Sequence, residues 1–280
     1  MVPSIGYGGM HLSIADRPPE PEALAVLAAA LDAGITLLDT ADVYCLDDGD
    51  LGHNERLIAA ALRAWPGPRE QVIVATKGGL RRPGGRWERN GRPEHLRAAC
   101  ERSLRALQVE RLDLYQLHAV DPQVPLEESV GALADLQRAG KVRWVGLSNV
   151  GVDEIRRAER IVPVTTVQNR LNPWFREALD GGVVAYCARR GIGFLAYSPT
   201  GGGRLTKTLP SHPVLARLAQ ELGFTAHELV LAWVLAQGPT VIAIPSARRV
   251  EHLRSSVRAG RITLSHADLD AISAARFDRH

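Results

Sequence analysis

The sequence predicts an α/β protein built as a single (β/α)8 barrel, the TIM-barrel fold, over residues 1–280. Short apolar segments alternate with segments of helical periodicity along the whole chain, which is typical of βαβ units and a parallel sheet. Eight strands are predicted, the number that closes a parallel barrel. No Gly-x-Gly-x-x-Gly sequence follows the first predicted strand, which disfavours the open dinucleotide-binding sheet as the alternative.

The strands are predicted from short apolar runs, and the helices from the periodic segments between them. In chain order the strands lie at 4–7, 35–38, 71–76, 112–117, 142–147, 164–168, 192–197 and 241–245. The helices lie at 21–33, 53–64, 93–107, 126–139, 152–160, 178–190 and 226–237, followed by a last barrel helix that opens at Arg248 and Arg249 and a terminal helix around 266–276. Three long segments, 42–52, 78–92 and 198–211, follow strands, so we expect them to lie over the face that carries the active site of such barrels.

Glycine and proline mark several helix ends. Gly34, Gly140 and Gly191 each follow a helical segment and precede a strand, which predicts a left-handed cap at each position. Pro93 is predicted to open its helix, because proline is favoured at the first helical position.

Composition limits the classes of function. The apolar fraction of 45% supports a sizeable core, and 280 residues suit one barrel better than two domains. The net charge of +3 without a basic run gives no reason to expect a nucleic-acid partner. The three cysteines lack metal-ligand spacing, and neither a signal peptide nor a membrane span is predicted, so we expect a cytoplasmic protein.

Four polar residues follow strand-like runs closely: Asp39, Tyr44, Lys77 and His118. Lysines number only three against 31 arginines, so a lysine at a strand end is not an arbitrary choice of cation. Its pKa shifts readily on burial and its charge is compact, unlike that of arginine. The carboxyl ends of barrel strands meet at one face, where these four groups can form a proton-delivery site.

Each of the four residues also has a structural interpretation. Asp39 can cap a turn, Tyr44 can be a loop aromatic, Lys77 can be a solvated lysine, and His118 can be a hydrogen-bonded core histidine. Their joint occurrence at successive strand ends favours the catalytic interpretation.

The motifs around these residues resemble the aldo-keto reductase superfamily, including its bacterial members. The resemblance covers roughly Ile5 to Arg258. It rests on Gly34-Ile-Thr-Leu-Leu-Asp-Thr-Ala-Asp-Val-Tyr44, the Lys77 strand, Asp113-Leu-Tyr-Gln-Leu-His118, Gly140-Lys-Val-Arg-Trp-Val-Gly-Leu-Ser-Asn149, Val167-Gln168-Asn169, Ala196-Tyr-Ser-Pro199 and Ile244-Pro-Ser-Ala-Arg248. It implies NADPH-dependent reduction of small aldehydes or ketones to alcohols, with Tyr44 as proton donor and without a metal ion. From reference pKa values, the Lys77 ammonium is expected to lower the pKa of Tyr44, and His118 is expected to orient the carbonyl.

The resemblance also implies cofactor and substrate contacts. Ser148, Asn149 and Gln168 would surround the nicotinamide amide, and Tyr197 would stack on its ring. Ser198, Thr200, Gly201 and Gly202 would hold the pyrophosphate, Ser246 and Arg248 the adenosine phosphate, and His252 and Ser256 would lie near the adenine. The substrate loops would be 42–52, 78–92 and 170–176, where Trp87 and Trp174 are the aromatic candidates for substrate binding or, equally, for packing.

The chain departs from the family pattern at several positions. The first predicted strand begins almost at Met1, so the usual N-terminal hairpin is largely absent, and Thr200 stands where leucine is common. Ser255-Ser256 stands where Glu-Asn or Gln-Asn usually holds the adenine. A cofactor-binding regulatory subunit with little activity is the main alternative function. A barrel lyase or metal-dependent hydrolase is disfavoured, because it needs more converging ligands than Asp39 and His118 supply.

Overall fold

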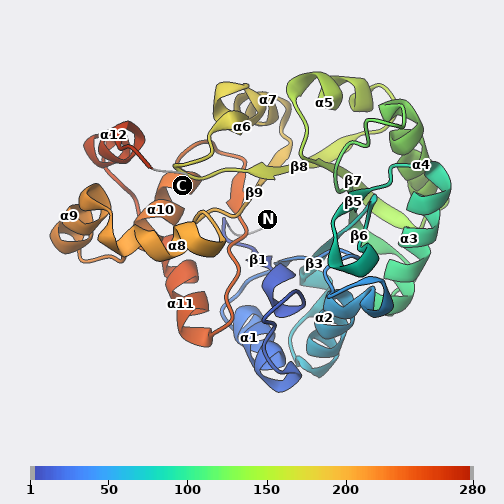
Figure 1. Ribbon diagram of the computed structural model, residues 1–280, viewed down its shortest axis with the longest axis horizontal. Coiled ribbons are helices and arrows are strands. Elements are labelled where there is room, and N and C mark those ends of the chain that lie inside the picture. Colours follow the sequence, from blue (N-terminus) through green and yellow to red (C-terminus); the bar gives the residue numbers. More distant parts are fainter. Residues whose placement is uncertain (1–3, 278–280) are drawn as a thin grey trace.

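Eight parallel strands form the centre of the computed structural model, which describes residues 4–277 (Figure 1). The strands are β1 (Tyr7–Gly8), β2 (Leu37–Asp39), β3 (Ile73–Gly78), β6 (Leu112–Leu117), β7 (Val142–Ser148), β8 (Val164–Arg170), β9 (Gly193–Tyr197) and β10 (Val241–Ala243), and they pair in that order. The segment around β1 also pairs with β10. The Gly6 amide donates to Ala243 O at 2.8 Å, and the Gly8 amide donates to Pro245 O at 3.0 Å. These bonds close the sheet into the predicted (β/α)8 barrel.

Helices surround the barrel (Figure 1). They are α1 (Glu20–Asp32), α2 (His53–Ala64), α3 (Pro93–Leu107), α4 (Leu126–Arg138), α5 (Val152–Glu159), α6 (Glu177–Asp180), α7 (Val183–Arg190), α8 (Gly203–Thr208), α9 (Pro213–Leu222), α10 (Ala226–Leu235), α11 (Val250–Ala259) and α12 (His266–Ala274). The helix predicted at 178–190 is two helices, because Gly182 adopts a left-handed φ of 73° before α7. Three elements were not predicted from the sequence: α8, α9 and the hairpin of β4 (Leu80–Arg81) and β5 (Glu88–Arg89), which lies in the loop 78–92.

The predicted helix ends are confirmed. Gly34, Gly140 and Gly191 have φ values of 83°, 76° and 67°, in the left-handed region that favours glycine. Pro93 is the first residue of α3. These caps turn the chain sharply from helix into strand, which keeps the βα units compact.

The barrel interior changes from apolar to polar toward the carboxyl ends of the strands. The side chains of Leu37, Ala75, Leu114, Leu195 and Ile244 form an inner apolar cluster. Because side chains alternate along a strand, residues two positions further on point the same way. Those next residues on β2, β3 and β6 are Asp39, Lys77 and Gln116, all buried. The apolar layer therefore lies beneath the polar site.

Apolar side chains also lie inside the opposite end of the barrel, where the strands begin. Ile73, Trp144 and Ile242, near the beginnings of their strands, pack against the inner apolar cluster. No strand hairpin precedes β1 among residues 4–277. No helix in the same part of the chain is long and apolar enough to cross a membrane.

Candidate active site

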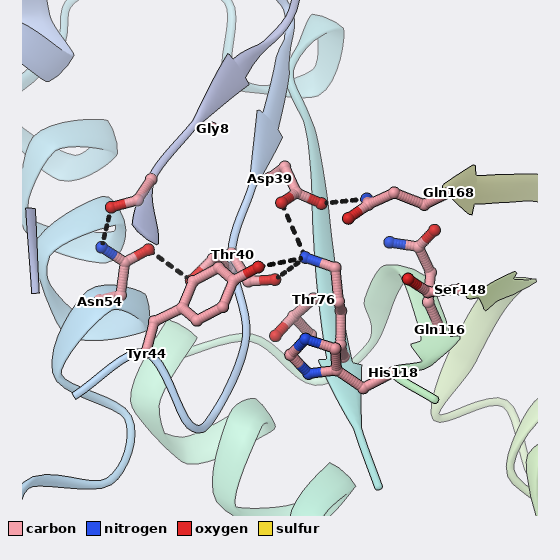
Figure 2. A network of polar contacts seen from close by, with 12 residues as sticks. Gly8, Asp39, Thr40, Tyr44, Asn54, Thr76, Gln116, His118, Ser148 and Gln168 are labelled. Atoms are coloured by element: carbon pink, nitrogen blue, oxygen red, sulfur yellow. Dashed lines mark hydrogen bonds and ion pairs between the residues drawn. The ribbon is translucent and has the colours of Figure 1, made fainter. Parts of the chain in front are cut away.

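Asp39, Tyr44 and Lys77 meet at the carboxyl end of the barrel through the lysine ammonium. Lys77 Nζ donates to Asp39 Oδ2 at 2.7 Å, to Thr40 O at 2.8 Å and to Tyr44 Oη at 3.0 Å (Figure 2). These contacts use the three donors of an ammonium group. Lysine therefore matches three acceptors that a planar guanidinium cannot reach in the same arrangement.

The Lys77–Asp39 pair is an ion pair inside the protein. The Lys77 side chain is 0% exposed and that of Asp39 is 3% exposed. Burial lowers the pKa of Lys77, but the Asp39 carboxylate and Tyr44 outweigh it, so the pKa lies above its ordinary value. Burial raises the pKa of Asp39, against the opposing effects of Lys77 and Gln168. At a separation of 2.7 Å each charge stabilises the charged form of the other.

The electrostatics of Tyr44 differ from the expectation. Its side chain is buried, and burial raises the pKa of the phenol more than Lys77 lowers it. The expected net decrease in the pKa of Tyr44 is therefore wrong. Lys77 still opposes the rise, which means that its charge stabilises a phenolate at this position.

His118 lies beside Tyr44 as a neutral imidazole. The centroids of the two rings are 5.8 Å apart at an interplanar angle of 80°. Burial, followed by the charge of Lys77, places the pKa of His118 well below its ordinary value. Its Nδ1 is buried and has no hydrogen-bond partner within residues 4–277. A neutral imidazole at this position can donate one hydrogen bond to a ligand next to the phenol.

Trp87 forms the outer part of the same site. Its ring centroid is 6.4 Å from those of Tyr44 and His118, and its side chain is 47% exposed. Three rings from two loops and a strand end thus lie close together. Trp87 is the member of the three that solvent and a ligand reach most easily.

Trp174, the second predicted substrate contact, is buried instead. It is 4% exposed and packs edge-on against Phe277, with centroids 4.9 Å apart. A Cβ at Gly201 would come within 2.9 Å of the Trp174 ring. Trp174 therefore packs beneath the loop that begins at Ser198, and this burial favours the packing interpretation.

Asn54, which was not predicted as a site residue, fixes the segment that leads from Asp39 to Tyr44. The amide of Asn54, from α2, donates to Gly9 O and to Ser13 Oγ, each at 2.8 Å. Its Oδ1 accepts from Thr40 Oγ1 at 2.7 Å (Figure 2). Asn54 could have been recognised in the sequence, because it is a polar residue on the apolar face of the helix predicted at 53–64.

A buried acidic pair lies behind the same loop. Asp42 Oδ2 accepts from Arg102 at 3.3 Å, and Glu55 Oε1 accepts from Thr76 Oγ1 at 2.6 Å. Burial, with the nearby Glu55 carboxylate, raises the pKa of Asp42 to about 8. The Asp42 carboxyl thus holds its proton at neutral pH although it is only two residues from Tyr44.

The predicted nicotinamide contacts are linked to the four central residues. Gln168 Nε2 donates to Asp39 Oδ1 at 2.6 Å. Asn149 Nδ2 donates to His118 O at 2.9 Å, and its Oδ1 accepts from Tyr197 Oη at 2.7 Å. Ser148 Oγ accepts from Asn149 Nδ2 at 3.1 Å. Gln168 therefore positions Asp39, while its contact with a nicotinamide stays a prediction.

The predicted pyrophosphate loop follows β9. Ser198 has a φ of 47°, and Gly201 and Gly202 have φ values of 93° and 68°. The Ser198 carbonyl accepts from the Gly201 amide at 2.9 Å, and Thr200 Oγ1 bonds Thr206 Oγ1 at 3.2 Å. Glycine fits two positions where the backbone is left-handed and where side chains would block close approach of a phosphate.

The predicted adenosine-phosphate residues lie between β10 and α11. Ser246 Oγ donates to Gly8 O at 2.6 Å, and Arg249 pairs with Glu251 at 3.5 Å. Arg248 is half-buried and forms no salt bridge within the described residues. No side chain caps the N-terminus of α11. An uncapped helix start beside an arginine without a carboxylate partner fits a phosphate group.

The two predicted adenine residues lie on α11. His252 is exposed, and Ser256 Oγ donates to His252 O at 3.1 Å, so this hydroxyl is bonded to the helix backbone. The neighbouring Ser255 Oγ donates to Glu228 Oε1 at 2.9 Å. At the position where the family usually binds adenine, both serine hydroxyls thus donate hydrogen bonds to other groups of the protein. Adenine contacts from these residues stay a prediction.

The donor set as a whole fits a nicotinamide dinucleotide. The loop after β9 has glycine at two positions with positive φ, and no side chain caps the start of α11, so both segments suit a phosphate. Ser148 and Asn149 offer donors and acceptors to an amide. No group of three His, Cys, Asp or Glu residues that could hold a metal ion is found in the part of the chain that the structure describes.

Comparison with known proteins agrees with this geometry. The family model described as "Aldo/keto reductase family" matches residues 4–276. The chain is 36% identical to a probable aldo-keto reductase 1 of Glycine max over 97% of this chain and 84% of that protein. It is also 36% identical to an uncharacterised oxidoreductase of Schizosaccharomyces pombe, over 95% of this chain and 84% of that protein.

Solved structures agree as well. The thermostable aldo-keto reductase Tm1743, bound to the inhibitor epalrestat, is 29% identical with a TM-score of 0.81, over 98% of this chain and 95% of that one. An aldo/keto reductase of Klebsiella pneumoniae in complex with NADP and acetate has the same identity and TM-score, over 97% of this chain and 90% of that one. The chain therefore belongs to the aldo/keto reductase family and is an NAD(P)H-dependent oxidoreductase.

Proposed function

We propose that the protein reduces small aldehydes or ketones to alcohols with NADPH, and that Tyr44 is the proton donor. The observation that carries the proposal is the position of Lys77 Nζ, 2.7 Å from Asp39 Oδ2 and 3.0 Å from Tyr44 Oη. Because the Lys77 side chain is buried between a carboxylate and a phenol, its charge does not interact with solvent. It is suited to stabilising negative charge on the phenol oxygen as that oxygen gives up its proton.

The pKa directions suit a proton donor. When bound, the reduced nicotinamide supplies the hydride. Tyr44 is protonated at neutral pH because its pKa is raised, so its proton is available for the carbonyl oxygen as that oxygen gains charge. An alkoxide is a stronger base than a phenolate, so the transfer is downhill. Lys77 stabilises the phenolate that remains, and general acid catalysis of this kind contributes about 10²–10⁴-fold to the rate.

His118 and Trp87 orient the substrate in this proposal. A neutral His118 donates a hydrogen bond to the carbonyl oxygen without competing for the proton that Tyr44 delivers. The half-exposed Trp87 ring packs against the apolar part of the substrate. These contacts fix the carbonyl oxygen between the phenol and the imidazole, which gives the orientation that a transfer of both hydride and proton requires.

The preference for NADPH over NADH is assigned to Arg248. A guanidinium at the start of a helix recognises a 2′-phosphate by charge and by geometry. Arg249 is the weaker candidate, because its charge is already paired with Glu251. The binding of NADP by the related Klebsiella pneumoniae protein supports the same cofactor here.

The test is NADPH oxidation by purified protein against a panel of aldehydes, ketones and sugars, with the Tyr44→Phe variant as control. The proposal expects turnover of at least one carbonyl class by the wild type and near-complete loss in the variant. Tight NADPH binding without turnover on any member of the panel would instead favour the regulatory-subunit alternative.

A further inference from the structure

A pocket lies behind the Tyr44 loop, outside the catalytic site. It has a volume of about 220 Å³ and is lined by Asp48, Leu51, Leu80, Arg81, Arg82, Pro83, His95 and Arg102. These residues come from the loop 42–52, from the β4–β5 hairpin and from α3. Neither Tyr44 nor His118 lines it. Leu80 belongs to the apolar cluster that contains Tyr44, and Leu51 packs against that cluster.

The lining is strongly basic. Three of its eight residues are arginines, and Asp48 is its one acidic residue. The charges of Arg102 and Arg81, after burial, lower the pKa of His95, which indicates that both arginines lie near this ring. The pocket is smaller than the roughly 300–1,000 Å³ typical of drug-sized ligands. Its size and charge suit a small anion.

Arg82 is the least usual of the three arginines. It is 6% exposed, and one of its terminal nitrogens donates to Cys45 O at 3.1 Å and Leu46 O at 3.2 Å. Its Nε is buried without a hydrogen-bond partner, and no carboxylate within residues 4–277 forms a salt bridge with it. A buried charge without a counter-ion is costly, so an anion close to it has a favourable effect.

The nearby acidic groups do not neutralise the pocket. Arg81 pairs with Glu88 at the surface, with its side chain 53% exposed. Arg102 pairs with Asp42 at a long 3.3 Å, and Asp42 keeps its proton at neutral pH. Behind Arg102, Glu55 accepts a hydrogen bond from Thr76 and does not line the pocket. The pocket therefore retains net positive charge.

We propose that this pocket binds a phosphate group, as inorganic phosphate or as a phosphate monoester, between Arg81, Arg82 and Arg102. Guanidinium groups donate forked hydrogen bonds that match phosphate oxygens, and a phosphate offers acceptors to more than one of them. Bound there, it links the β4–β5 hairpin to α3 and to the loop that carries Tyr44. Arg82 Cζ also lies 3.9 Å from the Trp87 ring centroid. A phosphate bound to Arg82 therefore contacts a residue that packs directly against Trp87, the proposed substrate contact.

The test is a calorimetric titration of the purified protein with inorganic phosphate at constant ionic strength, repeated with glycerol phosphate and with acetate. Each titration is run with and without NADP+, because NADP+ displaces phosphate that is bound at the cofactor site but not phosphate in this pocket. The two phosphate sources separate free phosphate from a monoester. Acetate, with one charge and two oxygens, is expected to bind at least about 10-fold more weakly.

The matched variants are Arg81→Gln and Arg86→Gln. Both arginines are exposed residues of the hairpin segment that pair with Glu88, but only Arg81 lines the pocket. Loss of one charge-assisted pair corresponds to about 10- to 100-fold weaker binding, so Arg81→Gln is expected to lose that much and Arg86→Gln almost nothing. Asp48→Asn removes the acidic residue of the lining and is expected to tighten binding by about 2- to 5-fold, in the range of an exposed charge interaction.

Saturable phosphate binding that survives NADP+, weakens in Arg81→Gln and tightens in Asp48→Asn supports the site. Absence of saturation in the wild type, equal losses in Arg81→Gln and Arg86→Gln, or complete displacement by NADP+ would each overturn it.

Discussion

Replacing Lys77 with methionine is expected to separate the structural from the catalytic role of the buried ion pair. Lys77→Met keeps the length of the side chain but removes all three hydrogen bonds from Nζ. Asp39, with its side chain 3% exposed, then becomes a buried carboxylate without its cation. Breaking a buried pair from one side costs about 3–5 kcal/mol, so urea unfolding should show a loss of this size at neutral pH.

The loss should depend on pH with a definite sign. Without the ammonium, the pKa of Asp39 in the folded protein rises further above its value in the unfolded chain. The folded state then binds more protons between the two pKa values, so the free energy of unfolding falls as pH rises through that range. Lys77→Met should therefore be closest to the wild type in mild acid. The double variant Asp39→Asn with Lys77→Met should recover much of the stability, because it leaves no buried charge.

Activity should follow a different pattern from stability. Lys77→Met and the double variant should both lose at least about 10²-fold in kcat, because neither stabilises the Tyr44 phenolate. Lys77→Arg should also fail to restore activity, since a planar guanidinium does not fit three acceptors around one point. Assays of NADPH oxidation measure this directly. Near-normal rates in Lys77→Arg would show that a positive charge is sufficient and would refute the reasoning.

Three further predictions concern the cofactor, the pH dependence and the two tryptophans. Arg248→Ala should weaken NADPH binding by about 10- to 100-fold and leave NADH binding unaffected, whereas Arg249→Ala should change the binding of neither cofactor. Fluorescence titration measures both affinities. Equal losses for the two cofactors in Arg248→Ala would place the 2′-phosphate elsewhere. Because the folded pKa of Asp42 is raised to about 8 from 3.8, its ionisation lowers the free energy of unfolding as pH rises from about 4 to 8. Asp42→Asn should remove that slope in urea unfolding, and an unchanged slope would contradict the buried-acid account. Trp87→Ala should raise KM for the carbonyl with little change in the melting temperature, whereas Trp174→Ala should lower that temperature sharply; the reverse result would exchange their roles.

Strand and helix order could be predicted because each signal was local. A glycine before a strand indicates a left-handed helix cap, and an apolar run of strand length indicates a buried strand. Pro93 correctly marked the start of α3. The helix α8 was missed because it begins at Gly203 in a glycine-containing loop, where helix propensity is poor. Its packing against the rest of the fold, which stabilises such a segment, is not visible in a local pattern. The helix α9 begins at Pro213 and ends before Gly223, so its local signals were present in the sequence.

The central residues were predictable from their positions at strand ends, but their electrostatics were not. The direction of the Tyr44 pKa depends on how completely the phenol is buried, and burial is a property of the folded chain. Trp174 and Trp87 looked equivalent as loop aromatics, yet Phe277, about a hundred residues later in the sequence, covers one of them. The partnerless Nε of Arg82 likewise emerges only when the hairpin and the loop 42–52 are brought together.

The proposed role of Tyr44 is tested most directly by comparing Tyr44→Phe with the wild type in single-turnover carbonyl reduction, with NADPH affinity measured on both proteins. The account predicts that the variant binds NADPH within about 2-fold of the wild type, since the lost hydroxyl contacts Lys77 rather than a residue predicted to bind the cofactor. It predicts a fall in the rate of reduction of about 10²–10⁴-fold. A variant that keeps a tenth or more of the wild-type rate would contradict the assignment of Tyr44 as the proton donor.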